Sequence, residues 1–520
     1  MKSCCIVWLA ILVANPGFAQ SGTPEMSASA AARFLDQATW GPTPAAISKL
    51  QQMGIEAWLK AQFALNTSNI PNQALLAPAG KPNRDIRPVQ AAFFENSVSG
   101  QDQLRQRVAF ALSQIWVVSF SGLPLAYAYP PYWRIFRDGA FGNYRDLIRA
   151  VTLSPAMGRY LNMANNNKAN PAKNTSANEN YARELMQLFT LGLTQLNPDG
   201  TPVLDQSQNP IPNYDQTVVT NMAKVLTGWT YPATPGAVSR NNNPQYFLGQ
   251  MLPVESEHDT SAKTIFGNIT IPAGQTADQD LDSLLDALMA QPTMAPFISK
   301  QLIQHLVTSN PSPQYIARVS SVFLNDGNGT RGNLQAVITA ILTDTEARAG
   351  DDPTATSSPA FGHLREPALF LSNLLRGLNA TLSADSTLYY DSAQLGEDVF
   401  DAPSVFSYFS PQYRIPGGLL GPEFQIFSTQ TAADRADMVN AILYGAIDKG
   451  TRVNLTPFLQ QAGNTASLLS VISGVFLHGW MSTALQQAAT EAVNGAVTPL
   501  AKTQAALYVV LTSDEYQIIH

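Results

Sequence analysis

The sequence predicts an all-α fold, made of one large multi-helix domain with long loops and one small β-hairpin. Apolar residues recur three and four positions apart along most of the chain, which is the spacing of an amphipathic helix. Strand-like alternation is sparse, and the segments between helical stretches are rich in Asn, Pro and Gly, which favour turns. The 520 residues are 45% apolar and 13% charged, so a large core is expected and a disordered chain is excluded.

Residues 1–19 have the pattern of a secretory signal peptide. Lys2 supplies a positive start, residues 6–13 form a short apolar run, and Ala19 ends a cleavage site of small residues. The run is shorter than the ~20 residues of a membrane-spanning helix, and the alternative is a buried N-terminal helix. Because Cys4 and Cys5 both lie here, the processed chain has no disulfide and no cysteine metal site. We expect an exported protein, periplasmic or secreted, with no transmembrane anchor.

Helical periodicity then predicts the elements in chain order. A helix start is expected at Thr43, which would cap the helix while Pro44 takes its first position. Helices are predicted over residues 27–35, 101–118, 144–153, 178–192, 215–226, 281–289, 294–308, 314–324, 333–342, 364–378, 429–443, 467–476, 484–493 and 501–511.

The predicted hairpin covers residues 264–271 and turns at Gly267-Asn268. Long loops are predicted over residues 165–176, 231–250, 350–358 and 401–422, and loops of this length tend to be functional or mobile. Residues 20–520 therefore form a single large helical domain, with 350–358 as a secondary candidate boundary.

Charge and motifs exclude several classes of function. The formal net charge is −7 and the basic residues are not in excess, which argues against a nucleic-acid binder. The chain has no phosphate-binding P-loop, no G-x-S-x-G elbow and no H-E-x-x-H pair. A zinc site made of His258, His305 and His363 is an alternative, but their spacing matches no zinc motif. We expect no metal and no cofactor.

The predicted helix over residues 178–192 carries the most informative charges. Glu179 and Arg183 are four residues apart and therefore neighbours on one face, whereas Glu184 lies between apolar positions. Two interpretations remain open. These charges form internal ion pairs, with Arg105 or Arg107 as further partners, or Glu184 is a partly desolvated carboxyl group suited to acid–base catalysis.

Two further segments carry candidate residues. His258, followed by Asp259 and then Lys263, could transfer protons, or the segment could be a capped turn held by hydrogen bonds. Trp229 and Tyr231 follow a predicted helix end at Gly228, where aromatic rings either stack on a ligand or anchor the loop to the core.

These segments resemble the bacterial family called domain of unknown function 1800. The most specific block is Glu-Asn-Tyr-Ala-Arg-Glu-Leu at residues 179–185, and similar blocks lie at 34–43, 104–113, 226–229, 258–263 and 512–517. The resemblance implies an exported, mostly helical protein with no established reaction. It also implies an exported sulfatase-like partner of the domain of unknown function 1501 family, whose genes often lie beside those of this one. Residues 401–417 lack the Trp that many members carry there.

The expected function is a hydrolase or lyase that acts on an extracellular polymer such as a polysaccharide. Glu184 would be the acid or base, His258 with Asp259 the second proton carrier, and Arg183 the charge stabiliser. The remaining candidates are Glu179 as a catalytic residue, and Trp229, Tyr231, Arg105, Arg107 and Lys263 as substrate-binding residues. The alternative is a non-enzymatic export or surface-assembly factor that binds a partner protein.

Overall fold

A computed structural model describes residues 26–267, 269–352, 360–445 and 447–520. Three sequence predictions fall outside these residues, wholly or in part. They are the signal peptide, residue 268 at the hairpin turn, and most of the candidate boundary at 350–358.

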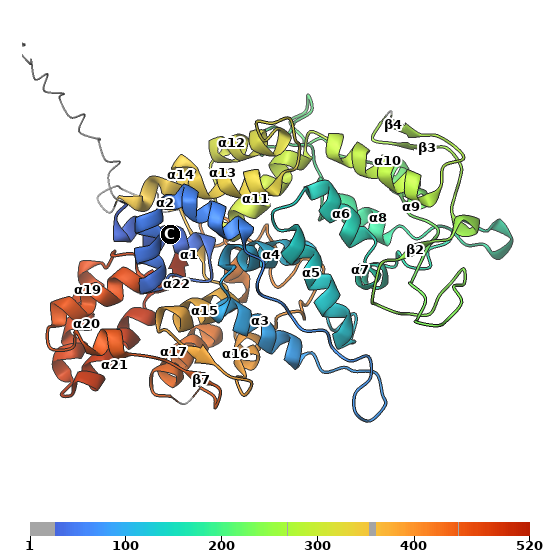
Figure 1. The fold of residues 1–520 in the computed structure, drawn as a ribbon. Helices are drawn as coiled ribbons and strands as arrows, with labels where there is room; N and C mark the ends of the chain where they lie inside the picture. The colour runs from blue at the N-terminus through green and yellow to red at the C-terminus, as the bar shows by residue number, and fades with distance from the viewer. Residues whose placement is uncertain (1–25, 268, 353–359, 446) are drawn as a thin grey trace, which may run out of the picture.

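The all-α prediction is confirmed. The described residues contain 22 α-helices and only strands of two or three residues (Figure 1). In the first half the helices are α1 (Ala28–Ala38), α2 (Pro44–Ala64), α3 (Arg87–Ser99), α4 (Gln103–Ile115), α5 (Tyr129–Gly139), α6 (Tyr144–Thr152), α7 (Pro155–Tyr160), α8 (Asn180–Gln187), α9 (Gln216–Val225), α10 (Ala277–Ala290) and α11 (Met294–Leu306). The second half has α12 (Pro313–Leu324), α13 (Leu334–Thr343), α14 (Thr345–Arg348), α15 (Pro367–Gly377), α16 (Leu388–Gln394), α17 (Thr429–Leu443), α18 (Thr456–Leu459), α19 (Thr465–Phe476), α20 (Thr483–Gly495), α21 (Pro499–Leu511) and α22 (Asp514–Gln517).

The strands form four antiparallel pairs, and one of them is the predicted hairpin, β3 (Lys263–Ile265) with β4 (Ile269–Ile271). The others join segments that are distant in sequence. They are β1 (Trp229–Thr230) with β2 (Leu252–Pro253), β5 (His363–Leu364) with β8 (Ile518–Ile519), and β6 (Thr381–Leu382) with β7 (Thr451–Arg452).

Helix starts follow local capping chemistry. The Thr43 side chain accepts a hydrogen bond from the Ala46 amide at 3.1 Å, with Pro44 at the first helical position, as the sequence predicts. Helix α5 has no counterpart among the helices expected from the sequence, and it contains Pro130 and Pro131. They occupy the first turn, where a missing amide proton costs no helical hydrogen bond.

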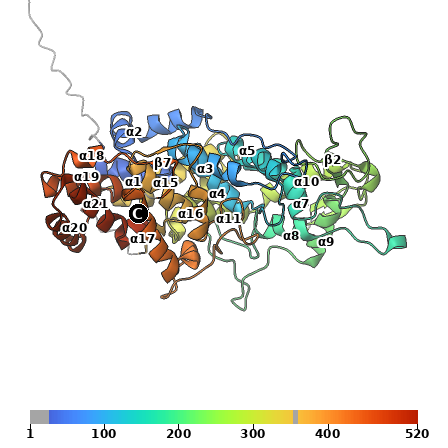
Figure 2. The ribbon, with the colours of Figure 1, turned by 90° about the horizontal axis from the view of Figure 1, so that it is seen from below.

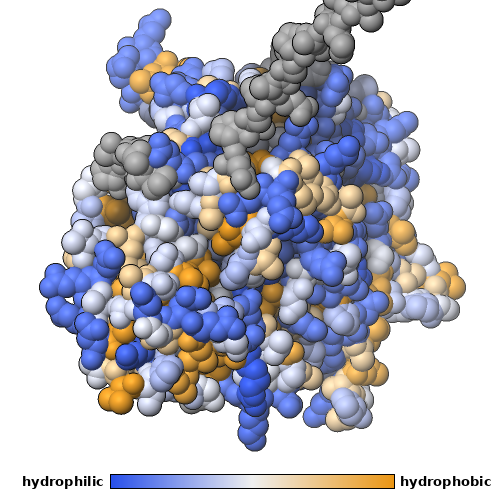
Figure 3. All heavy atoms as spheres, turned by 60° about the vertical axis from the view of Figure 1, so that its left-hand side comes forward, coloured by the Kyte–Doolittle hydropathy of each residue, from blue (hydrophilic) through white to orange (hydrophobic). Residues whose placement is uncertain are grey.

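The molecule is elongated (Figures 1 and 2). Helices α6–α10 lie at one end, whereas α1, α2 and the C-terminal helices α17–α22 lie at the other. On the face formed at this second end, hydrophobic and hydrophilic residues are interspersed, as is usual for a water-exposed surface (Figure 3).

A buried ion pair ties the two ends of the chain together. Asp36 on α1 receives two hydrogen bonds from the Arg365 guanidinium group, at 2.6 and 2.7 Å. His478, just beyond α19, lies 2.9 Å from the same carboxylate, and Asn373 on α15 donates to it at 2.7 Å. The β5–β8 pair adjoins this network, because the backbone of Tyr516 on α22 accepts from the Arg365 side chain.

Two helices in the interior position the candidate site. Every residue of α15 is buried, and every residue of α4 except Ser113 is buried. Because α4 carries Arg107 and Gln114 in addition to its apolar residues, polar groups are carried into the core. A buried polar group without a hydrogen-bond partner destabilises the folded protein. The surroundings of these groups are therefore candidate functional sites.

Candidate functional site

The exposed charges of α8 form the pair that their spacing predicts. Arg183 lies 2.8 Å from the Glu179 carboxylate, and both side chains are partly exposed. Hydrogen bonds from Gln216 and Thr220, together with the Arg183 charge, lower the pKa of Glu179 below its ordinary value. Glu179 is therefore an ionised carboxylate that its neighbours already satisfy.

Glu184 lies apart from both arginines that were suggested as its partners. Its Oε2 atom is buried and has no hydrogen-bond partner, and burial raises the pKa of its carboxyl group although the Arg183 charge opposes this. Arg105 donates instead to backbone carbonyl groups of Phe63, Leu65 and Arg137, and Arg107 to that of His305. Partial desolvation of Glu184, one of the two interpretations, is present in the structure.

Glu184→Gln is expected to unfold at the same temperature as the wild type or at a higher one at pH 7. Because the folded-state pKa of Glu184 is raised from 4.5, the folded protein resists ionisation of this group. The free energy of unfolding of the wild type therefore falls relative to that of the variant as pH rises above 4.5. Below pH 4.5 the two proteins should have similar free energies of unfolding. Melting curves at pH 4 and pH 7 measure this difference. A large loss at pH 7 would instead place Glu184 in a stabilising ion pair.

His258 is paired with Asp280 on α10 and not with its neighbour in sequence. The His258 Nε2 atom lies 3.1 Å from Asp280 Oδ2, and Lys263 Nζ lies 2.5 Å from the same oxygen. The side chains of all three residues are fully buried. His258 Nδ1 also lies 2.9 Å from the Thr227 carbonyl oxygen. The triad joins the segment around β3 to α10.

Asp259 stabilises a turn and does not touch the triad through its side chain. It accepts hydrogen bonds from the amide and the hydroxyl group of Ser261, at 2.9 and 2.5 Å. We expect Asp259→Asn to change the free energy of unfolding by less than about 1 kcal/mol, because the Asn oxygen can accept the same bonds. Urea denaturation measures this, and a loss of several kcal/mol would show that the carboxylate charge itself holds the loop.

Trp229 and Tyr231 anchor the loop that follows α9. Trp229 is 2% exposed and Tyr231 is 5% exposed, and Trp229 belongs to the β1–β2 pair. Gly228 has a φ of +82°, and a Cβ atom there would lie within 3 Å of the His258 backbone. Glycine at position 228 of the Leu-Thr-Gly-Trp block is thus required by its positive φ and by the packing of the loop against His258. Tyr231 still borders a shallow pocket, which is described below.

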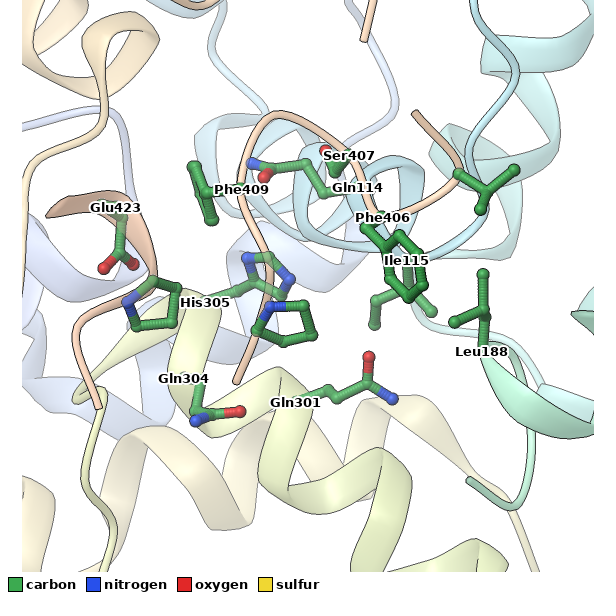
Figure 4. Close-up of a pocket in the computed structure, with 13 residues that line it drawn as sticks. Gln114, Ile115, Leu188, Gln301, Gln304, His305, Phe406, Ser407, Phe409 and Glu423 are labelled. Atoms are coloured by element: carbon green, nitrogen blue, oxygen red, sulfur yellow. The ribbon is translucent and has the colours of Figure 1, made fainter. Parts of the chain in front are cut away.

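A different group of residues converges on a pocket between α4, α11 and the loop that leads to Glu423 (Figure 4). We call it the Glu423 pocket. Its cavity volume is about 40 Å³, enough for a few water-sized groups. Four polar atoms on its wall are buried without a partner, namely Gln114 Oε1, Gln301 Nε2, Ser407 Oγ and Glu423 Oε2. Since buried polar atoms normally have partners, the pocket is suited to receive a polar group.

Three buried carboxyl groups lie at and behind this wall. Glu423 Oε1 is 3.2 Å from His363 Nδ1, which leaves Glu423 Oε2 free. Glu366 accepts a hydrogen bond from the Gln114 amide at 2.8 Å. Glu397 accepts at 2.7 Å from the Ala368 amide in the first turn of α15, where a carboxyl group complements the helix dipole.

Their environment keeps two of these groups protonated to a higher pH than an ordinary carboxyl group. Burial raises the pKa of Glu366, and Glu423 adds to this rise while Arg107 opposes it. Burial and the adjacent Glu366 carboxyl raise the pKa of Glu397 well above its usual range. Because ionisation of one of these carboxyl groups opposes ionisation of the other, their protons are lost in linked steps.

His305 supplies a neutral imidazole at the pocket wall. Burial lowers its pKa to about 3, and the nearby Arg107 and His363 contribute to the shift. At neutral pH its ring is therefore a hydrogen-bonding group without charge. The Arg107 guanidinium group lies behind it, fully buried, with two nitrogen atoms that have no partner.

The loop that closes the pocket is held in an unusual backbone conformation. Phe400 and Ser407 have φ values of +71° and +67°, which are rare for residues with a side chain. Tyr408 and Phe409 fasten the loop by packing with Val117 in a small separate apolar cluster. Such strain costs free energy and persists where surrounding contacts enforce it, which is common at functional sites.

Within the described ranges, no group of three or more His, Asp or Glu side chains could hold a metal ion. His258 faces Asp280, whereas His305 and His363 belong to the Glu423 pocket and its surroundings, so the three-histidine zinc alternative has no support. A search of the described helices finds none long and apolar enough to span a membrane.

The three glutamates are not recognisable from the sequence, because no spacing connects them. Glu366 and Glu397 are 31 residues apart and Glu423 follows 26 residues later, on separate elements. The sequence does carry one signal: Arg365-Glu366 directly precedes a mostly apolar helix, and charges at the border of a buried helix must be compensated.

Comparisons with known proteins identify the family and go no further. The chain matches the model of the family described as Protein of unknown function (DUF1800) over residues 33–518. Neither curated proteins nor solved structures give a match. Because the match covers nearly the whole chain, the protein belongs to the domain of unknown function 1800 family.

Proposed function

We propose that this chain is an exported hydrolase or lyase that acts on a polymer such as a polysaccharide, and that Glu423 is its proton-transfer group. One observation carries the proposal: Glu423 lines a small pocket and has a buried carboxyl oxygen without a protein partner. A general acid or base must reach the reacting proton directly, and a free oxygen at a cavity meets that need.

The neighbouring groups support a division of roles. His363 orients the Glu423 carboxyl group through its other oxygen. Behind the pocket, burial raises the pKa values of Glu366 and Glu397, so these carboxyl groups hold protons more readily than ordinary ones. Neutral His305 and the free Gln114 oxygen would hydrogen-bond a hydroxyl group or a water molecule.

The pocket wall favours an uncharged, hydroxylated reacting group. Amide side chains of Gln114, Gln301 and Gln304 hydrogen-bond hydroxyl groups, and the rings of Phe406 and Phe409 offer apolar faces. The cavity admits the attacking water or a sugar hydroxyl, whereas a whole sugar ring must lie outside, against the loop. This arrangement suits a chain polymer, in which only the scissile bond enters.

A panel of neutral and acidic polysaccharides, incubated with the purified protein, tests the proposal. Hydrolysis releases new reducing ends, and a lyase creates a double bond that absorbs ultraviolet light, so the two readouts separate the reactions. We expect one of the two products from at least one polysaccharide. No product from any of them, with and without the co-expressed sulfatase-like neighbour, would overturn the proposal.

A second candidate function, binding of a partner protein, is favoured by an exposed arm over residues 192–213. Its base is fixed by a hydrogen bond from the Leu196 amide to Thr293 at 3.2 Å. Leu193 and Leu204 on the arm are 61% and 42% exposed. Burial of apolar side chains is favourable, so exposed ones can mark a surface that a partner covers. If the sulfatase-like partner docks there, Leu204→Ser should abolish its co-purification, whereas unchanged recovery would exclude the arm.

A further inference from the structure

A second pocket, more open than the first, lies between the end of α7 and the loop that follows Tyr231. Its cavity volume is about 290 Å³, close to the lower end of the usual range for small-molecule sites. It is lined by Arg159, Asn162, Asn165, Tyr231, Asn243 and Gln245, with three small or apolar residues between them. It shares no wall residue with the Glu423 pocket.

Arg159 is the only charged residue of this wall. Across the described part of the chain, no hydrogen bond or ion pair engages its guanidinium group, whereas most arginines of the chain have such a partner. Tyr231 is the other titratable residue that lines this pocket. Burial raises the pKa of Tyr231 to about 12, and the Arg159 charge opposes this rise. The pocket therefore offers a positive charge with no carboxylate to neutralise it.

The amide groups around Arg159 are held in place before any ligand arrives. Asn165 donates to the Asn243 carbonyl group at 3.2 Å and accepts from Thr230 at 2.6 Å. Asn243 in turn donates to the Tyr231 carbonyl group at 2.7 Å and to the Ser239 hydroxyl group at 3.1 Å, so both of its amide protons are used. Asn162 uses its side-chain oxygen to accept from Asn180, which leaves its amide protons available. Fixed amides bind with little loss of entropy.

This set of groups matches one class of ligand. Amide side chains and a phenol ring pair with the hydroxyl groups and apolar faces of a sugar, and a single guanidinium group pairs with one anionic substituent. A free phosphate would be better served by several converging cations. Since the chain carries a net charge of −7, an acidic polymer is repelled by the protein as a whole and must be held by local contacts.

We propose that the pocket at Arg159 binds an acidic sugar unit of a polysaccharide, in which a carboxylate or a sulfate ester contacts the guanidinium group. This inference rests on the proposed function in one respect: the bound polysaccharide is taken to be the substrate of the enzyme. In that case the substrate chain runs over the protein surface, and the pocket holds one unit while another reacts at Glu423.

Isothermal titration of the full chain with three oligosaccharides tests the proposal. Polygalacturonate fragments carry carboxylates, heparin fragments carry sulfates, and dextran fragments are neutral. We expect tighter binding of at least one acidic fragment than of dextran, and the tighter of the two identifies the anionic group. Arg159→Gln should weaken that binding at least tenfold and leave weak binding of dextran unchanged.

Two matched variants separate local recognition from general charge and from misfolding. Arg84→Gln removes the same charge from an exposed side chain outside the pocket and should change affinity less than twofold. Asn162→Gly removes one amide while it preserves a backbone with a φ of +62°, so it should weaken binding without lowering the melting temperature.

Equal losses in Arg159→Gln and Arg84→Gln would overturn the proposal, as would equal affinity for acidic and neutral fragments. Glu423→Gln should keep full binding while it loses turnover. Binding without turnover in the wild type would therefore contradict only the proposed function, and turnover that does not depend on Arg159 would contradict only this inference.

Discussion

Asp36→Asn is expected to lower the free energy of unfolding by about 3–5 kcal/mol, the usual cost of removing one partner from a buried ion pair. Both side chains of the Asp36–Arg365 pair are 1% exposed. Without the carboxylate, the Arg365 charge stays buried and uncompensated, and His478 and Asn373 lose their acceptor. The contact of α1 with the C-terminal elements would be weakened. Denaturation by guanidinium chloride measures the loss.

Asp286→Asn is the matched control, because it breaks an ion pair of the same length at the surface. The Arg145–Asp286 distance is also 2.6 Å, but the Asp286 side chain is 69% exposed. Solvent screens such pairs, so the expected cost is below about 1 kcal/mol. Equal losses in the two variants would contradict the claim that burial makes the Asp36 pair important.

The Asp36 pair also predicts how stability changes with pH. Burial by itself would raise the pKa of Asp36, but the Arg365 charge and the His478 hydrogen bond outweigh it and lower the pKa far below 3.8. A carboxylate with a lowered pKa contributes stability above its unfolded-state pKa and loses it as the pH falls. The difference between wild type and Asp36→Asn should therefore shrink below about pH 3.8.

Glu423→Gln is expected to reduce turnover by about 10²- to 10⁴-fold, the range for loss of a general acid or base. The amide keeps the shape of the side chain but cannot exchange a proton with the substrate. The melting temperature should stay the same or rise, because a carboxyl oxygen that is buried without a partner is unfavourable in the free protein. Initial rates and melting curves on one preparation measure both quantities.

Glu95→Gln is the control for this loss, since Glu95 is exposed on α3 and belongs to no described pocket. It should leave turnover unchanged. A Glu423→Gln variant that keeps more than a tenth of the wild-type rate would contradict the role assigned to Glu423.

The sequence predicts local structure well because local structure depends on neighbours along the chain. Helical periodicity identifies most of the helices, capping identifies the start of α2, and a spacing of four identifies the Glu179–Arg183 pair. The exceptions are also local. The predicted helix over residues 178–192 ends earlier, since α8 stops at Gln187 and residues 188–190 form hydrogen-bonded turns.

The sites depend on contacts that no spacing encodes. Asp259 is next to His258 in the sequence, but in the folded chain the His258 ring pairs with Asp280 and the Asp259 carboxylate pairs with Ser261. The Glu423 pocket combines α4, α11 and a loop near residue 410, which are separated by roughly 100 residues or more. Glutamates next to prolines, such as Glu366 and Glu423, look like turn residues until the fold buries them.

The central claim is that the chemistry takes place at Glu423 and not on α8. The most direct measurement compares the turnover of Glu423→Gln and Glu184→Gln on the same polysaccharide. We expect the turnover rate to fall at least 100-fold in Glu423→Gln and to stay within a few-fold of the wild-type rate in Glu184→Gln. The reverse order, with Glu184→Gln inactive and Glu423→Gln active, would contradict it and place the active site at α8.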